Sequence, residues 1–198
     1  VELIIRPEQD GDRLLQLLAK IPNLANLARL DLTVRPSNEL SENLLDHLSD
    51  FLLTTKSLTT LQIQLREFVK SNSVNSFIEQ LKECNVLSSL ALQFKDCSCV
   101  DNSLLMSLTR SLKNLPKFTK LALSCQTSSS SSTTLQYTNS GMKSFFNSIS
   151  ALENLEEFGL SFQESSEFVI NQEFIAVCKS LKNLKKLQKL TLKIYDTK

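Results

Sequence analysis

Six hexamers of the form L-x-x-L-x-L, with phenylalanine or isoleucine in place of leucine in some copies, recur along the chain. We call the middle of the three apolar residues in each hexamer the anchor. The anchors are Leu30, Leu61, Leu90, Leu121, Phe158 and Leu190. Consecutive anchors are 29 to 37 residues apart. Self-similarity at such a period is typical of repeat architectures, in which one structural unit is copied and stacked.

The residues around each anchor predict one helix and one strand per unit. The positions 9, 13 and 16 residues before the anchor are apolar in all six copies, for example Leu52, Leu48 and Leu45 before Leu61. Offsets of three and four residues place these side chains on one face of a helix. From the anchor onward the apolar period changes to two, which indicates a strand with one buried face.

Stacked units of this kind predict an α/β solenoid. Neither the helix nor the strand can bury its apolar side alone, so neighbouring units must share a core between a sheet layer and a helix layer. Because a helix connects successive strands, the sheet is expected to be parallel. A truncated first strand at the start of the chain, with Val1 as its anchor, precedes about six helix–strand repeats.

The repeat resembles the leucine-rich repeat, whose core reads L-x-x-L-x-L-x-x-N/C-x-L, and its length resembles the ribonuclease-inhibitor-like subtype. The resemblance implies a horseshoe with the parallel sheet on the concave side, helices on the convex side, and protein binding on the concave sheet. One departure is clear, because the asparagine or cysteine position of the family is replaced throughout. It holds Arg6, Arg35, Arg66, Lys95, Gln126, Gln163 and Tyr195.

We expect residues 1–198 to form a single leucine-rich-repeat domain that is a fragment of a longer protein. Residues 126–140 contain five consecutive serines and predict a Ser/Thr-rich flexible loop insertion. The 22 basic and 21 acidic residues give a net charge of +1, so no global field favours nucleic acid or a membrane surface. Five cysteines, an odd number, favour reduced thiols and a cytoplasmic location.

The outward positions of the strands supply the candidate partner-binding residues. Four cations at the replaced consensus position, Arg6, Arg35, Arg66 and Lys95, are expected to stack along one edge of the sheet. The polar candidates beside them are Thr33, Gln62, Gln64 and Gln93. The cations are either a docking strip for an acidic segment or phosphate, or a solvated edge neutralised by Glu8, Glu67 and Asp96.

The sequence offers little for catalysis or for metal binding. His47 is the only histidine, which excludes zinc sites rich in histidine, and Cys97-Ser98-Cys99 has no second cysteine pair. With three glycines in the whole chain, a glycine-rich phosphate loop is not expected. We therefore predict no enzyme activity, no cofactor, no catalytic residue and no metal site.

The predicted function is a non-catalytic protein–protein interaction module that presents a concave sheet to a protein partner, without binding nucleic acid or a membrane. The protein is expected to belong to a larger chain or assembly. The alternative is a regulatory repeat region that acts on an enzyme, either like a GTPase activator or as a sensor or autoinhibitory region. An activator would place an arginine at the nucleotide site of its partner, and Arg29, Arg35 and Arg66 are the candidates.

Overall fold

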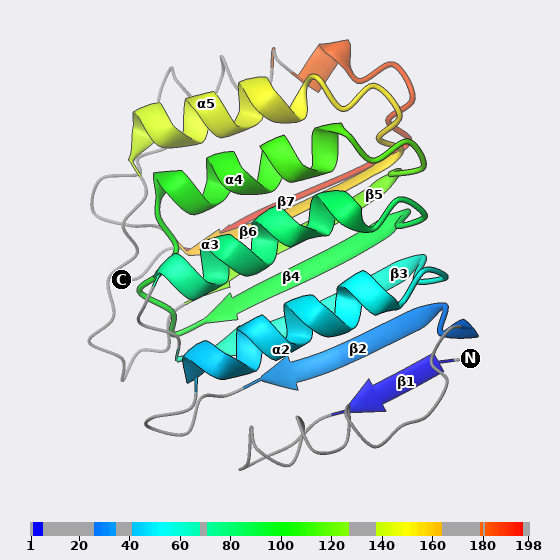
Figure 1. Ribbon diagram of the computed structural model, residues 1–198. Coiled ribbons are helices and arrows are strands. Elements are labelled where there is room, and N and C mark those ends of the chain that lie inside the picture. The colour runs from blue at the N-terminus through cyan, green and yellow to red at the C-terminus, as the bar shows by residue number, and fades with distance from the viewer. Residues whose placement is uncertain are drawn as a thin grey trace.

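The fold is a seven-stranded parallel sheet covered on one face by helices (Figure 1). The computed structural model describes residues 2–5, 26–34, 41–67, 71–126, 138–163, 179 and 181–195. The strands are β1 (Glu2–Ile5), β2 (Arg29–Val34), β3 (Thr60–Arg66), β4 (Ser89–Lys95), β5 (Lys120–Gln126), β6 (Glu157–Gln163) and β7 (Lys189–Tyr195). They are paired in the order in which they occur along the chain. The α/β class and the parallel sheet are as the sequence predicts.

The helices form a second layer whose members also follow chain order. The helices in the described residues are α2 (Ser41–Thr54), α3 (Ser71–Gln80), α4 (Asn102–Lys113) and α5 (Asn139–Ile149), with 3₁₀ turns η2 (Leu81–Glu83) and η3 (Leu181–Asn183). Each of these α-helices packs beside the next one in sequence. The helix expected before Leu30 and most of the one expected before Leu190 lie outside the described residues, as does most of the predicted loop at 126–140.

The six anchors are aligned across the sheet. The register pairs each anchor with the next, from Leu30 in β2 through to Leu190 in β7, so the six hexamers are adjacent strands. In β1 the residue paired with Leu30 is Leu3. The prediction of Val1 as the first anchor is therefore wrong by two residues. A shift of two leaves the same face of a strand buried, so apolar alternation alone could not separate Val1 from Leu3.

The core lies between the two layers and contains the residues that the periodicity predicts. On the helix side, the described members of the stripe 9, 13 and 16 residues before each anchor are all buried. On the strand side, the alternation extends to Val34, Leu65, Phe94, Cys125 and Phe162, which are buried as well. Leu190 is the exception, with 45% of its surface exposed, because β7 is an edge strand with a neighbour on one side only.

Two strands end in a left-handed residue that is not glycine. Glu67 follows β3 with φ 62° and Asp96 follows β4 with φ 56°. The backbone N–H of Glu67 donates to the carbonyl oxygen of Lys95 at 2.9 Å, and that of Asp96 donates to Gln126 at 2.9 Å. The left-handed residue therefore adds one more hydrogen bond between neighbouring strands before the chain leaves the sheet.

Candidate functional site

The face of the sheet opposite the helices carries a continuous band of polar side chains. Because side chains alternate along a strand, the residues one and three positions after each anchor point away from the helices. The register aligns the residues three positions after the anchors of β2–β7 in a single row across the sheet. This row consists of Thr33, Gln64, Gln93, Ser124, Ser161 and Lys193. We refer to this side of the sheet as the open face.

The structure brings the four uncharged candidates together on β2, β3 and β4. Thr33, Gln64 and Gln93 are direct neighbours in the row, and Gln62 lies two residues before Gln64 on β3. The hydroxyl of Thr33 donates to Oε1 of Gln64 at 3.4 Å. Gln93 is exposed, while the other three are half-buried. The four candidates therefore form one contiguous polar area on the open face.

Two of the four cations expected in one row lie in the described residues. Arg66 and Lys95 are register neighbours at the ends of β3 and β4, and both are half-buried. The next position in the same row is the uncharged Gln126 in β5. Arg6 and Arg35 lie outside the described residues. The described part of the row is thus a pair of cations, each followed by the acidic residue, Glu67 or Asp96, that turns the chain.

A third arginine weighed for a regulatory role is held by an acidic neighbour. Nε of Arg29 in β2 lies 3.0 Å from Oε1 of Glu2 in β1. Next to this pair, Asp31 occupies an outward position but is only 6% exposed, between Ile4 and Gln62 in the register. The carboxylate of Asp31 therefore adds little to the accessible surface of the open face.

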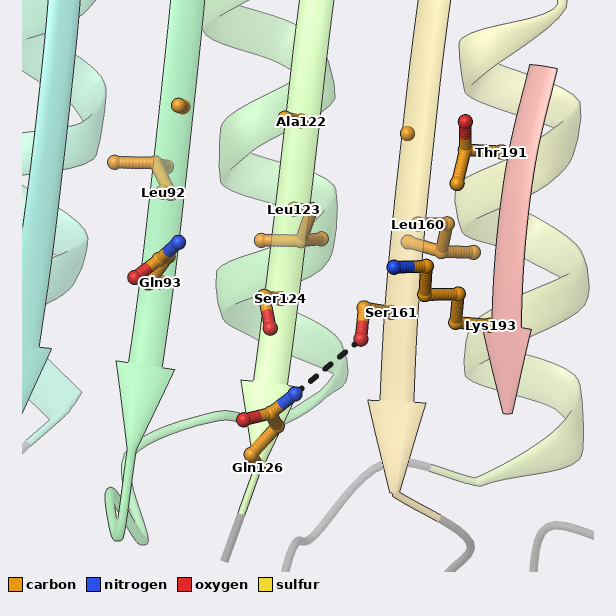
Figure 2. Close-up of a pocket in the computed structure, with 12 residues that line it drawn as sticks. Leu92, Gln93, Ala122, Leu123, Ser124, Gln126, Leu160, Ser161, Thr191 and Lys193 are labelled. Carbon is orange, nitrogen blue, oxygen red and sulfur yellow. Dashed lines mark hydrogen bonds between the residues drawn. The ribbon is translucent and has the colours of Figure 1, made fainter. Parts of the chain in front are cut away.

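A hollow of about 300 Å³ lies on the open face over β4–β7 (Figure 2). Three small residues in one register row, Ala91, Ala122 and Gly159, leave the backbone of the sheet uncovered along its floor. Hydroxyl and amide groups border it, and Nε2 of Gln126 donates to Oγ of Ser161 at 3.4 Å. This hollow is not among the sites expected from the sequence, although small residues at the same position of three repeats were its signal.

Lys193 supplies the charge in this hollow. Its side chain extends from β7 over β6, so that the ammonium group lies above Leu160 and Ser161 (Figure 2). Among the described residues no acidic side chain forms an ion pair with Lys193. A positively charged group therefore projects over a floor of small residues and a border of neutral hydrogen-bonding groups.

The four strands beneath the hollow carry more basic than acidic residues. The four strands β4–β7 contain Lys95, Lys120, Lys189 and Lys193 but only one acidic residue, Glu157. Nζ of Lys120 lies 2.6 Å from Oε1 of Glu157. This hydrogen-bonded pair raises the pKa of Lys120 and lowers the pKa of Glu157, so both groups are charged at neutral pH.

The cysteines of the described residues are buried in the core. The thiol of Cys97 donates to the carbonyl oxygen of Leu65 at 3.3 Å. A hydrogen bond with Cys97, together with burial, raises the pKa of Cys99, and burial raises the pKa of Cys125. Protonated buried thiols are poor nucleophiles and poor metal ligands. The described residues contain no group of three or more histidine, cysteine or acidic side chains arranged to hold a metal ion.

The remaining chemistry-bearing residues do not add a site. His47 lies exposed on α2, away from the open face. Cys178 lies outside the described residues. None of the helices in the described part of the chain combines the length and apolarity needed to cross a bilayer.

Comparison with known proteins bears on the fold. No protein-family model matches the chain, and no curated protein matches it in sequence. The structure is similar to that of actin-binding site 2 of leiomodin-1, with a TM-score of 0.56, 12% identity, and coverage of 90% of this chain and 91% of that one. It is also similar to the C-terminal domain of a Caenorhabditis elegans tropomodulin, with a TM-score of 0.53, 14% identity, and coverage of 89% and 93%. At these identities the likeness shows the fold, and a parallel sheet with its strands in chain order fits the repeat fold expected from the sequence.

Proposed function

We propose that this protein is a non-catalytic interaction module that binds a protein partner on its open face. In this proposal the solenoid is a horseshoe of the ribonuclease-inhibitor-like kind, and the open face is its concave side. The observation that carries the proposal is the row of polar side chains from Thr33 to Lys193, aligned across six strands and left uncovered by the helices. A rigid sheet can present such a row without reshaping on binding.

Actin is the first partner to test. One of the structural neighbours is an actin-binding site of leiomodin-1, and its fold extends over nearly all of this chain. At 12% identity the likeness concerns the fold, so actin is proposed here as a candidate. The regulatory alternative receives no support from Arg29, whose guanidinium is paired with Glu2.

Site-specific photo-cross-linking tests the proposal. A benzoylphenylalanine is placed at Gln93 on the open face, and a matched one at Glu79 on the outer helix layer, both of which are exposed. Purified actin is tested first and a cell extract second. We expect the probe at Gln93 to form a discrete cross-link to a protein and the probe at Glu79 to form none. Equal cross-linking from both positions, or none from Gln93, would overturn the proposal. A cross-link from Gln93 to a protein other than actin would keep the module and replace the partner.

A further inference from the structure

We propose that the hollow over β4–β7 binds an acidic peptide segment of the partner, with a carboxylate of that segment on Lys193. This inference rests on the proposed function, because it specifies the chemistry of the segment that the open face would hold. The proposed site differs from the expected strip of cations, because it consists of the floor of small residues and the ammonium group of Lys193 above that floor.

The dimensions of the hollow suit a short stretch of polypeptide. Its floor crosses β4, β5, β6 and β7, and neighbouring strands are about 4.8 Å apart, so it is roughly 14 Å long. Extended chain rises about 3.3 Å per residue, so about four residues span that length. The volume of about 300 Å³ is at the lower limit for ligand pockets, which favours a short segment over a folded surface.

The groups that border the hollow match the needs of a peptide backbone. Ser124 and Ser161 can donate or accept a hydrogen bond, and the amides of Gln93 and Gln126 can do both at once. The apolar floor at Ala91 and Ala122 leaves room for backbone atoms to approach the sheet. A segment lying across the strands could therefore satisfy its own N–H and C=O groups along this border.

Charge decides which side chains the segment should carry. Lys193 lies in the hollow without an acidic partner among the described residues, and the strands beneath have an excess of three positive charges. The segment 179–193 contains six lysines and no acidic residue, so the charge continues beyond the end of the hollow at β7. An acidic segment complements this surface, while a basic segment would be repelled.

A peptide is favoured over a nucleic acid. Proteins that bind single-stranded nucleic acid stack its bases on aromatic side chains, and none of the described residues that line the hollow is aromatic. The net charge of the whole chain is only +1, so the field that attracts a polyanion from a distance is weak. Nucleic-acid binding is therefore treated as an outcome of the test.

The test measures binding of a fluorescein-labelled peptide of alternating glutamate and alanine by fluorescence anisotropy, at low and at physiological salt. Two variants of the full chain address the two features of the hollow. Lys193→Glu reverses its charge, and Gly159→Val fills its floor. The Gly159 position accepts a Cβ, since the nearest atom to an added one is Cβ of Ala122 at 3.6 Å. We expect each variant to weaken binding by about fivefold or more.

Lys82→Glu is the matched control for charge, because Lys82 is an exposed lysine in η2, next to the helix layer. Its affinity should stay within about twofold of the unmodified protein. An equal loss in Lys82→Glu would mean that only net charge matters, and an unchanged affinity in Gly159→Val would mean that the hollow is not used. Tighter binding of an oligothymidylate than of the peptide would equally overturn the inference. If Gly159→Val did not fold, Ala122→Leu would fill the same floor from an exposed position.

The inference and the proposed function can fail separately. If the acidic peptide does not bind but cross-linking still occurs from Gln93, the open face binds a protein of other chemistry. If the peptide binds in the hollow and no protein is cross-linked from Gln93, the hollow holds acidic peptides but the proteins tested do not use it.

Discussion

The side-chain amide of Asn102 occupies the space into which any side chain at position 141 would project. A Cβ built on Gly141 would collide with Oδ1 of Asn102. That amide links the first turns of α4 and α5 through Thr138: its Nδ2 donates to the Thr138 hydroxyl at 3.1 Å, and its Oδ1 accepts from the Thr138 N–H at 3.0 Å. The Thr138 hydroxyl in turn caps α5 by accepting from the N–H of Gly141 at 3.1 Å.

Gly141→Ala should therefore destabilise the fold although alanine is the better helix former. The substitution displaces the Asn102 amide and removes two hydrogen bonds, each worth about 0.5–1.5 kcal/mol. The gain in helix propensity offsets at most about 1 kcal/mol. We expect a net loss of about 1 kcal/mol in the free energy of unfolding, measured by urea denaturation.

A double-mutant cycle with Asn102→Ala isolates this contact. Once the amide is gone, Gly141→Ala should be neutral or stabilising. The same loss of stability in both backgrounds would show that the contact between positions 102 and 141 is not the cause.

The left-handed residue after β3 predicts a preference for glycine there. Glu67→Gly and Glu67→Val both remove the carboxylate, so their difference reports on the backbone at φ 62°. A left-handed conformation costs a residue with a side chain about 1–2 kcal/mol, and more when it is β-branched. We expect the glycine variant to be more stable than the valine variant by that amount in urea denaturation.

Gln93 in β4 provides the opposite control for this comparison. It is an exposed strand residue and is not among those with positive φ. Within a strand valine is favoured and glycine is unfavourable, so Gln93→Val should be more stable than Gln93→Gly. The same order at both positions would contradict the explanation from backbone conformation.

The pair of Lys120 and Glu157 predicts a stabilising contribution that depends on pH. The pKa of Glu157 is lowered in the folded protein, so its contribution is present above the ordinary glutamate pKa of 4.5 and is lost as the pH falls through the lowered value. The pKa of Lys120 is raised, so its contribution is present below the ordinary 10.5 and is lost as the pH rises through the raised value. Stability from this pair should therefore be constant around neutral pH and fall at both extremes.

The measurement compares the urea midpoints of the unmodified protein and of Glu157→Gln from acid to neutral pH. Because both side chains are well exposed, the difference at neutral pH should be small and should shrink in high salt. It should vanish in acid, where both proteins carry an uncharged side chain at this position. Glu153→Gln, in the turn before β6, serves as the control. A difference in urea midpoint between the two proteins that grew as the pH fell would contradict the lowered pKa of Glu157.

The buried thiols should resist alkylation in the folded protein. Burial raises the pKa of Cys84 and of Cys125, and a hydrogen bond with Cys97, together with burial, raises the pKa of Cys99. Since the thiolate is the reacting species, iodoacetamide at mildly alkaline pH should label them slowly in native buffer and completely in urea. Peptide mass spectrometry locates the label, and a cysteine placed at the exposed Ser103 should react fast under native conditions. Rapid native labelling of Cys99 or Cys125 would contradict their burial.

Periodicity located most of the fold because each of its two periods has a single physical meaning. Apolar residues at offsets of three and four can share a face only on a helix, and apolar residues at every second position can share one only on a strand. The anchors, the helix stripe and the extra buried residue at Phe94 or Phe162 all follow from this rule. The same rule could not choose between Val1 and Leu3, since both satisfy the alternation.

The two apolar periods predict that this chain stacks helix–strand units into a parallel sheet, because that arrangement buries both the helix stripe and one face of each strand. The positions of the hollow and of its charge on the open face follow from contacts in the folded protein. Ala91, Ala122 and Gly159 are 31 and 37 residues apart in sequence and become one floor only through strand register, and the reach of Lys193 over β6 depends on its own side-chain conformation. The small residues do recur one position after the anchor, but the side chains around them decide whether they leave a hollow, and the direction of a single side chain leaves no periodic trace in the sequence.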